Sequence, residues 1–170
     1  YKGSLAVSDE VLLKHRIDRM YDVYASEAQF RKADHFIAEF AKTLDLKENY
    51  SSREFLSLLG ANISRQGDKN SIIVSAYECG VPIFAPALND SSIGIGLMIA
   101  RRNGYRLIID SMKDVDEITR IVERAEKTGV IYVGGGVPKN FIQQTEVVSS
   151  ILGSELGGHD YAIQFTTDSP

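Results

Sequence analysis

A run of three glycines at positions 134–136 is the feature of this sequence best suited to chemistry. It follows the apolar segment 130–133 and precedes Pro138, an order that predicts a strand, a turn and a helix start. Glycine lets a ligand approach the backbone closely, and a helix N-terminus attracts phosphate through its unpaired N–H groups and dipole. The residues therefore predict a nucleotide or phosphate loop, and the alternative is a tight turn that needs small residues. The spacing is not G-x-G-x-x-G, so a standard Rossmann dehydrogenase is not indicated.

Polar residues follow further apolar segments, and the carboxyl ends of parallel strands are where ligands gather. The carboxylate of Asp90 suits a ribose, a nicotinamide amide or a cationic amine, and it equally suits a helix N-cap. For Asp110, a capping or turn role is favoured over contact with a ribose. Thr167 and Asp168 follow the last apolar segment, where they either line the same cleft or are simply exposed.

The bulk composition narrows the classes of function. The 170 residues carry a formal net charge of −4, so no excess of positive charge favours binding to nucleic acid. The single cysteine means that no internal disulfide can form. No apolar run is long enough to span a bilayer and no signal peptide is evident, so a cytoplasmic protein is expected. The histidines His15, His35 and His159 lack metal-ligand spacing, so no metal site is predicted. Lys139 adjoins the glycines and suits a phosphate, although a surface lysine is the favoured interpretation.

Apolar periodicity predicts helices in the N-terminal region of the chain and alternating helices and strands in the remainder. Apolar residues recur at helical spacing from Ala33 to Leu44, and Ser51 with Glu54 resembles a capping box that opens a helix over 53–64. The later helices are expected at 71–79, at 91–102, from a second capping box of Asp114 and Glu117 to a closing Gly129, and at 139–152. The strands are expected at 81–85, 105–110, 130–133 and 161–165.

Strands that alternate with helices of about 10–15 residues indicate parallel βαβ units. We therefore expect an α/β fold, with a parallel sheet that has helices on both faces, in a single domain over 1–170. Residues 1–69 are expected to be helical, and residues 70–170 to carry the alternating elements and the nucleotide site. Because the chain starts at a tyrosine and stops just after a strand, we also expect it to be a fragment of a longer protein.

Several blocks of residues together resemble the deoxyhypusine synthase family. They stand in the family's order and extend over nearly the whole chain, and their details look closest to archaeal or bacterial synthase-like members. The blocks are Ile17-Asp18-Arg19, the P-x-F-x-P-A-L-x-D stretch from Pro82 to Asp90 with its continuation to Gly94, the G-G-G-V-x-K stretch from Gly134 to Lys139, and Asp160-Tyr161-Ala162.

The resemblance implies a Rossmann-like NAD-binding fold and an NAD-dependent aminobutyl transferase. Family members dehydrogenate spermidine, release 1,3-diaminopropane, and pass the butylimine through an enzyme lysine to an acceptor amine. The acceptor is a lysine of the translation initiation factor 5A precursor, whereas related enzymes use putrescine and make homospermidine. The family forms homotetramers with NAD and substrate between paired subunits. The residues implied to line the NAD site are Asp90, Gly134, Gly135, Gly136, Thr167 and Asp168, and those implied to face the polyamine are Asn140 and Gln144.

Three departures from the family pattern concern the substrate. Asn140 stands where eukaryotic synthases carry a histidine, Ile95 where they carry a substrate-binding acidic residue, and Gln144 replaces an asparagine. A carboxylate is the natural partner of a polyamine ammonium group, so its loss is expected to weaken capture. The family's imine-forming lysine belongs to a Ser-Trp-Gly-Lys motif downstream of position 170, and this chain contains no tryptophan. The chain alone is therefore expected to be inactive in transfer, and a non-catalytic NAD-binding or oligomerisation module is the alternative outside the enzyme class.

Overall fold

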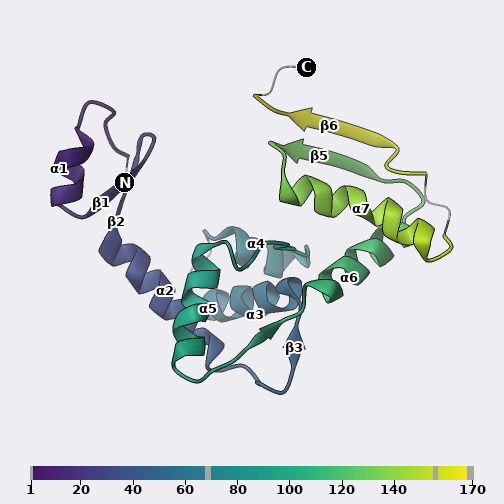
Figure 1. Ribbon diagram of the computed structural model, residues 1–170, viewed down its shortest axis with the longest axis horizontal. Helices are drawn as coiled ribbons and strands as arrows, with labels where there is room; N and C mark the ends of the chain where they lie inside the picture. The colour runs from purple at the N-terminus through teal and green to yellow at the C-terminus, as the bar shows by residue number, and fades with distance from the viewer. Residues whose placement is uncertain (1, 68–69, 155–156, 168–170) are drawn as a thin grey trace. The chain divides into compact units, whose positions relative to one another are not determined.

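The computed structural model describes residues 2–67, 70–154 and 157–167. The chain divides into two compact units. The first comprises residues 1–47 and 88–107, and the second comprises residues 48–87 and 108–170. Figure 1 shows the elements of both units along the chain. Within the described ranges, no helix has the length and apolar character needed to cross a membrane.

The first unit combines a small β-hairpin with helices. Its elements are α1 (Asp9–Lys14), β1 (Ile17–Met20), β2 (Val23–Ser26), α2 (Glu27–Ala41) and α5 (Ser92–Arg102), with β1 and β2 antiparallel. The hairpin lies in the region of the chain that the apolar periodicity describes as helical. Its two-residue connection includes Tyr21, which adopts a positive φ of 56°.

Helices α2 and α5 pack closely because small residues line their contact. Ala38, Ala41 and Ala100 form the buried cluster between them. At Gly96, a Cβ atom would lie 2.6 Å from the Cβ of Ile37, so the backbones approach more closely than a side chain at this position would allow. The helical spacing read from the sequence is thus confirmed over α2, where its apolar stripe becomes the buried face.

The second unit carries both parallel strand pairs. Its elements are β3 (Asn49–Tyr50), α3 (Ser52–Arg65), α4 (Ile72–Cys79), β4 (Ile108–Ile109), α6 (Ser111–Arg124), β5 (Gly129–Val133), α7 (Val137–Ile151) and β6 (Tyr161–Phe165). Strand β3 pairs with β4, and β5 pairs with β6, both in parallel. The structure therefore confirms a mixed α/β chain with parallel strands, held in two separate two-stranded ladders.

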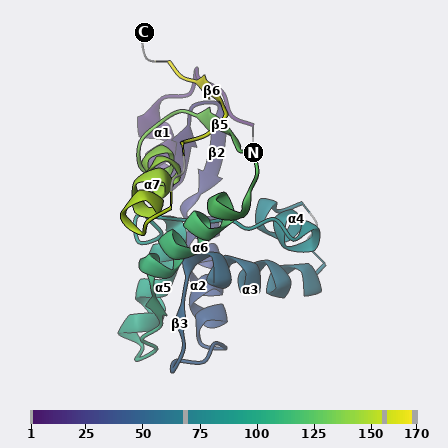
Figure 2. The same ribbon diagram turned by 90° about the vertical axis from the view of Figure 1, so that its right-hand side faces the viewer.

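Helix α7 lies along one face of the β5–β6 ladder, as the two views in Figures 1 and 2 agree. The register pairs Ile131 with Ile163 and Val133 with Phe165, which places these side chains on one face. All four are exposed, whereas Val130 and Tyr132, which alternate with them along β5, are half-buried. Among the described residues, the ladder is thus covered on its α7 side, and these four side chains leave the other face exposed.

Several local signals are confirmed. The Ser51–Glu54 capping box is complete, because Glu54 N–H donates to Ser51 Oγ at 3.0 Å and Ser51 N–H donates to the Glu54 carboxylate at 2.8 Å. Helix α4 ends at Gly80, which adopts the left-handed conformation with a φ of 66°. Strand β6 has the expected bounds, and Pro138 lies in the first turn of α7.

One expected strand is not formed, and another is shorter than expected. The segment 81–85 forms no strand, because Pro82 lacks an N–H and the N–H groups at both ends of the segment bond elsewhere. Val81 donates to the carbonyl of Ala76, and Ala85 donates to Ser52 Oγ at 2.8 Å. The expected strand 105–110 shrinks to Ile108–Ile109, since its partner β3 has only two residues.

The expected capping box of Asp114 and Glu117 is also wrong. Helix α6 begins at Ser111, four residues earlier than this box requires, because Asp110 is its N-cap and accepts from Met112 N–H at 3.0 Å. The helix ends at Arg124, so Gly129 does not close it and instead begins β5.

Asp114 turns its carboxylate away from its own helix and caps another. It is 1% exposed and accepts hydrogen bonds from the N–H groups of Ser52 (2.9 Å) and Arg53 (3.1 Å), in the first turn of α3. This contact joins α3 to α6 inside the second unit and satisfies donors that a helix start otherwise leaves unpaired.

Charged side chains reinforce this junction between α3 and α6. Arg53 Nε donates to the Glu117 carboxylate at 2.8 Å, and Lys113 Nζ lies 3.2 Å from Glu54 Oε2. Burial raises the pKa of the Glu54 carboxyl, but the hydrogen bond from Ser51 N–H and the ammonium of Lys113 outweigh it, so this pKa lies below its usual range.

Candidate functional site

The glycine turn connects the carboxyl end of β5 to the start of α7. Gly134 and Gly136 adopt positive φ angles of 82° and 80°, which other residues rarely tolerate. Gly134 N–H donates to the carbonyl of Phe165 at 2.8 Å, so the turn begins as an extension of the β5–β6 ladder. A Cβ atom at Gly135 would meet no heavy atom within 4 Å. The turn is therefore open on the side where a side chain at this position would project.

The N-terminus of α7 has the features of an anion site. Its N-cap is Gly136, and no side chain caps it. Four other described helices have a side-chain cap, from Ser26, Ser51, Ser91 and Asp110. The first turn of α7 also carries no acidic residue. Its N–H groups and the positive end of its dipole are thus left for a ligand that carries negative charge.

Lys139 lies in this first turn but does not form an ion pair with any carboxylate of the described residues. Its Nζ donates to Oε1 of Gln164 at 2.8 Å and lies 5.4 Å from the centroid of the Tyr132 ring. Lys139 is half-buried in this position. The ammonium group is therefore positioned next to the glycine turn by the neutral amide of Gln164 and the aromatic face of Tyr132, and neither cancels its charge.

A hollow of about 340 Å³ lies alongside the turn. It is bordered by β5 on one side and by the first two turns of α7 on the other, and the described residues that line it include Gly134, Gly135, Pro138, Lys139 and Ile142. The glycine turn thus opens onto a concave surface rather than onto a packed core.

The structure places the other predicted residues of this unit that it describes just after β6 and on α7. Thr167 is exposed and follows β6, whose last residue pairs with the last residue of β5. Asn140 is exposed and Gln144 half-buried, and they lie four residues apart on one face of α7. Asp168 lies outside the described residues.

Asp90 belongs to the first unit, where its side chain is exposed just before α5. It is not the helix cap. Ser91 caps α5, accepting from Gly94 N–H at 3.2 Å and donating to the carbonyl of Leu88 at 2.5 Å. Among the described residues, no hydrogen bond or ion pair engages the Asp90 carboxylate. The capping alternative for Asp90 is therefore excluded, and its carboxylate remains available to a ligand.

The remaining titratable candidates have structural contacts. Asp110 caps α6, as the favoured interpretation predicts. His159 Nδ1 hydrogen-bonds with Thr128 Oγ1 at 2.9 Å, and His15 Nδ1 with the carbonyl of Val11 at 2.8 Å, while His35 is exposed. Across the ranges that the structure describes, no group of three His, Cys, Asp or Glu residues could hold a metal ion.

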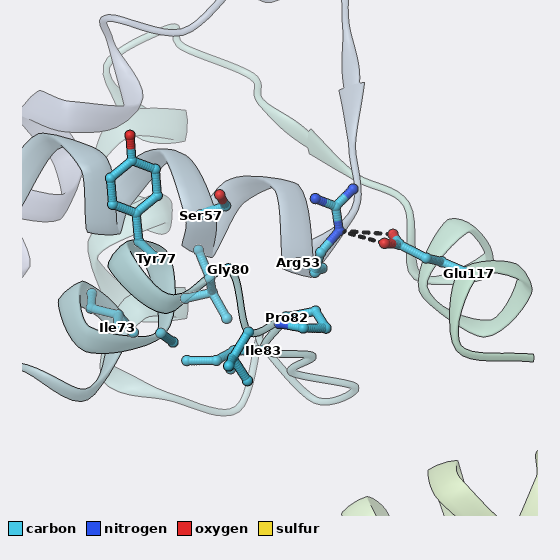
Figure 3. Close-up of a pocket in the computed structure, with 11 residues that line it drawn as sticks. Arg53, Ser57, Ile73, Tyr77, Gly80, Pro82, Ile83 and Glu117 are labelled. Carbon is cyan, nitrogen blue, oxygen red and sulfur yellow. Dashed lines mark hydrogen bonds and ion pairs between the residues drawn. The ribbon is translucent and has the colours of Figure 1, made fainter. Parts of the chain in front are cut away.

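A second concave surface, missed by the sequence analysis, lies between α3 and α4 (Figure 3). This groove has a volume of about 320 Å³. Figure 3 shows the Arg53–Glu117 ion pair at one end and Tyr77 toward the other. Its walls combine apolar side chains such as Leu56 and Ile73 with polar groups, and the Arg53 guanidinium is already paired with Glu117. Because α3 and α4 meet only through tertiary packing, no local sequence signal could reveal it.

The family is clear from comparison with known proteins. The model of the deoxyhypusine synthase family matches residues 1–170, so the chain belongs to the deoxyhypusine synthase family. The family resemblance read from the glycine, proline and aspartate blocks is thereby confirmed.

Particular relatives are similar over the whole chain. The chain is 61% identical to "Probable deoxyhypusine synthase 2" of Methanosarcina acetivorans, covering 100% of this chain and 49% of that protein. It is 44% identical to the "Deoxyhypusine synthase-like protein" of Coxiella burnetii strain Dugway 5J108-111, covering 98% of this chain and 48% of the relative. The chain thus spans about half the length of these relatives.

A solved structure is similar as well. The crystal structure of a "putative deoxyhypusine synthase" from Entamoeba histolytica superimposes with a TM-score of 0.59 at 27% identity, over 65% of this chain and 40% of that one.

Proposed function

We propose that this chain forms the NAD-binding region of an aminobutyl transferase of the deoxyhypusine synthase type. The observation that carries the proposal is the open glycine turn at the end of a parallel strand pair, followed by the uncapped N-terminus of α7. In a member of this family, that arrangement suits the pyrophosphate of a dinucleotide. The proposal includes a Rossmann-like NAD-binding fold in a single domain and a cytoplasmic homotetramer.

The residues fit NAD by their chemistry. Gly135 and Gly136 would present backbone N–H groups to the pyrophosphate without a side chain in the way, and Gly134, whose N–H donates to Phe165, would let the ligand approach the turn closely. Asp90, Thr167 and Asp168 are proposed to supply oxygens for the ribose and amide groups of the dinucleotide. When bound, NAD supplies the acceptor and donor of hydride for dehydrogenation of an amine and reduction of an imine.

Asn140 and Gln144 are proposed to face the polyamine. Their amide oxygens accept hydrogen bonds from ammonium groups without neutralising them. Ile95, which is 56% exposed on α5, offers no carboxylate where eukaryotic synthases have an acidic residue. We therefore propose spermidine or a related polyamine as donor, with either a lysine of the translation initiation factor 5A precursor or putrescine as acceptor. The homospermidine synthase type follows if putrescine is the acceptor.

The test is covalent trapping in the full-length gene product. The protein is incubated with NAD and spermidine, reduced with borohydride, and analysed by mass spectrometry for a butylamine adduct on a lysine. An adduct together with released 1,3-diaminopropane supports the transferase. If NAD binds but no adduct forms with any polyamine tested, the chain is a non-catalytic NAD-binding module. If NAD does not bind, the whole proposal falls.

Asp90→Asn is expected to weaken binding of NAD or spermidine about tenfold, because it removes the negative charge that is proposed to contact the ligand. Among the described residues, no hydrogen bond or ion pair depends on that charge. The melting temperature should stay within about 1 °C, as for an exposed substitution that breaks no contact. The contrasting variant is Ser91→Ala, which removes the real cap of α5 and should cost about 1 kcal/mol of stability. A drop in melting temperature with unchanged ligand affinity in Asp90→Asn would mean that Asp90 is structural. Titration calorimetry and thermal melts provide both measurements.

A further inference from the structure

Gln164 is the side chain that ties the glycine turn, Lys139 and β6 together. In the β5–β6 register it pairs with Tyr132, whose ring lies on the α7 side. Its Nε2 donates to the carbonyl of Gly134 at 3.0 Å, and its Oε1 accepts from Lys139 Nζ at 2.8 Å. Both ends of one amide are thus engaged, each by a different portion of the candidate site.

The first residue of the turn is held to β6 from both of its backbone groups. Gly134 N–H donates to the Phe165 carbonyl, and the Gly134 carbonyl accepts from Gln164. A run of three glycines has the greatest backbone freedom of any sequence and no side chain with which to limit it. The Gln164 side chain, called the brace below, therefore limits the conformations that the peptide of Gly134 can adopt before a ligand binds.

The choice of glutamine matters for the charge of Lys139. A neutral amide fixes the ammonium group without cancelling its charge, whereas a carboxylate at the same position would form an ion pair with it. A carboxylate would also place an oxygen against the Gly134 carbonyl in place of the donor that Gln164 provides. Gln164 therefore donates a hydrogen bond to the Gly134 carbonyl and leaves the positive charge of Lys139 uncancelled.

We propose that Gln164 is a positioning residue that holds the glycine turn in its binding conformation and holds the charge of Lys139 beside it. The effect on NAD affinity rests on the proposed function, whereas the effect on the turn itself does not. Preorganisation of this kind acts by reducing the ordering cost that a ligand must overcome.

The test uses Gln164→Met in the full-length protein, which keeps the length of the side chain and removes both hydrogen bonds. We expect the Kd and the KM for NAD to rise about five- to tenfold, with kcat at saturating NAD unchanged. The backbone amide of Gly134, which donates to the Phe165 carbonyl, should exchange with solvent faster, as measured by hydrogen-exchange mass spectrometry. Gln143→Met, at an exposed position of α7 outside the site, is the matched control and should change neither quantity.

Gln164→Glu separates the two contacts of the brace. It keeps an acceptor for Lys139 but loses the donor to Gly134 and neutralises the ammonium, so NAD should bind at least as weakly as to Gln164→Met. The dependence of the Kd on salt should also become shallower.

Unchanged Kd and unchanged exchange in Gln164→Met would overturn the proposal. Faster exchange with an unchanged Kd would also overturn it, since the brace would then hold the turn without serving the ligand. If the wild-type protein binds no NAD, the proposed function fails. The brace is then judged by exchange alone, with faster exchange in Gln164→Met supporting it and equal exchange refuting it.

Discussion

Gly135→Asp is expected to abolish NAD binding while leaving the fold intact. The position offers open space, because a Cβ atom there would have no heavy atom within 4 Å, and its φ lies outside the positive range of its two glycine neighbours. An aspartate can therefore be accommodated without backbone strain. Its carboxylate would project from the turn that is proposed to hold the pyrophosphate.

The size of the effect follows from Coulomb's law. Two unit charges about 4 Å apart repel by about 4 kcal/mol at an effective dielectric constant of about 20. That energy corresponds to a roughly 1,000-fold loss of affinity, and screening by salt leaves an expected loss of at least about 100-fold. Titration calorimetry with NAD measures it directly.

Two control variants separate charge from bulk and from net charge. Gly135→Asn has the same shape as Gly135→Asp without the charge, so it should lose much less affinity. Gly157→Asp adds the same charge at another glycine of the second unit that has open space, and it should bind NAD like the wild type. Equal affinity of Gly135→Asp and Gly157→Asp would remove the glycine turn from the NAD site.

The turn could be predicted from the sequence because its signals are local. An apolar strand, three glycines and an early proline stand next to one another, and the capping box of Ser51 and Glu54 lies within four residues. Local patterns of this kind predict the same local structure whatever the tertiary fold around them. The same locality explains why α3, α4, α5, α7 and β6 are close to their expected bounds.

The errors arise where apolar character alone predicts a strand. The segment 81–85 is apolar, but Pro82 cannot donate to a ladder and Ala85 N–H is taken by Ser52, 33 residues away. Strand pairing and capping compete for the same N–H groups, and only tertiary structure decides between them. Gln164 illustrates the same limit: its alternation along β6 is visible in the sequence, but its contacts with Gly134 and Lys139 depend on how the turn folds back.

Asp114 is the most instructive of these errors, and it carries the largest expected effect on stability. Its spacing to Glu117 matches a capping box, yet its carboxylate caps α3 at Ser52, 62 residues earlier in the chain. Asp114→Asn retains the shape of the side chain but leaves only one acceptor for two N–H donors and turns an NH₂ group toward the other. Hydrogen bonds to a charged group contribute about 1.5–3 kcal/mol each, and the helix dipole adds to them.

We therefore expect Asp114→Asn to lower the free energy of unfolding by about 3 kcal/mol. For a chain of this size, that corresponds to a melting temperature lower by roughly 6–12 °C. Asp116→Asn, on the same helix, removes only an ion pair with Arg120 at a side chain that is 56% exposed, so it should cost less than about 0.5 kcal/mol.

Hydrogen exchange locates the cause of this destabilisation. The amides of Ser52 and Arg53 should lose protection in Asp114→Asn before the rest of α3 does, because these are the donors that lose their acceptor. Equal melting temperatures for Asp114→Asn and Asp116→Asn would mean that the capping contact contributes nothing measurable. A large loss of stability with protected Ser52 and Arg53 amides would instead assign the effect to packing around α6, since those two donors would then have kept a partner without the carboxylate.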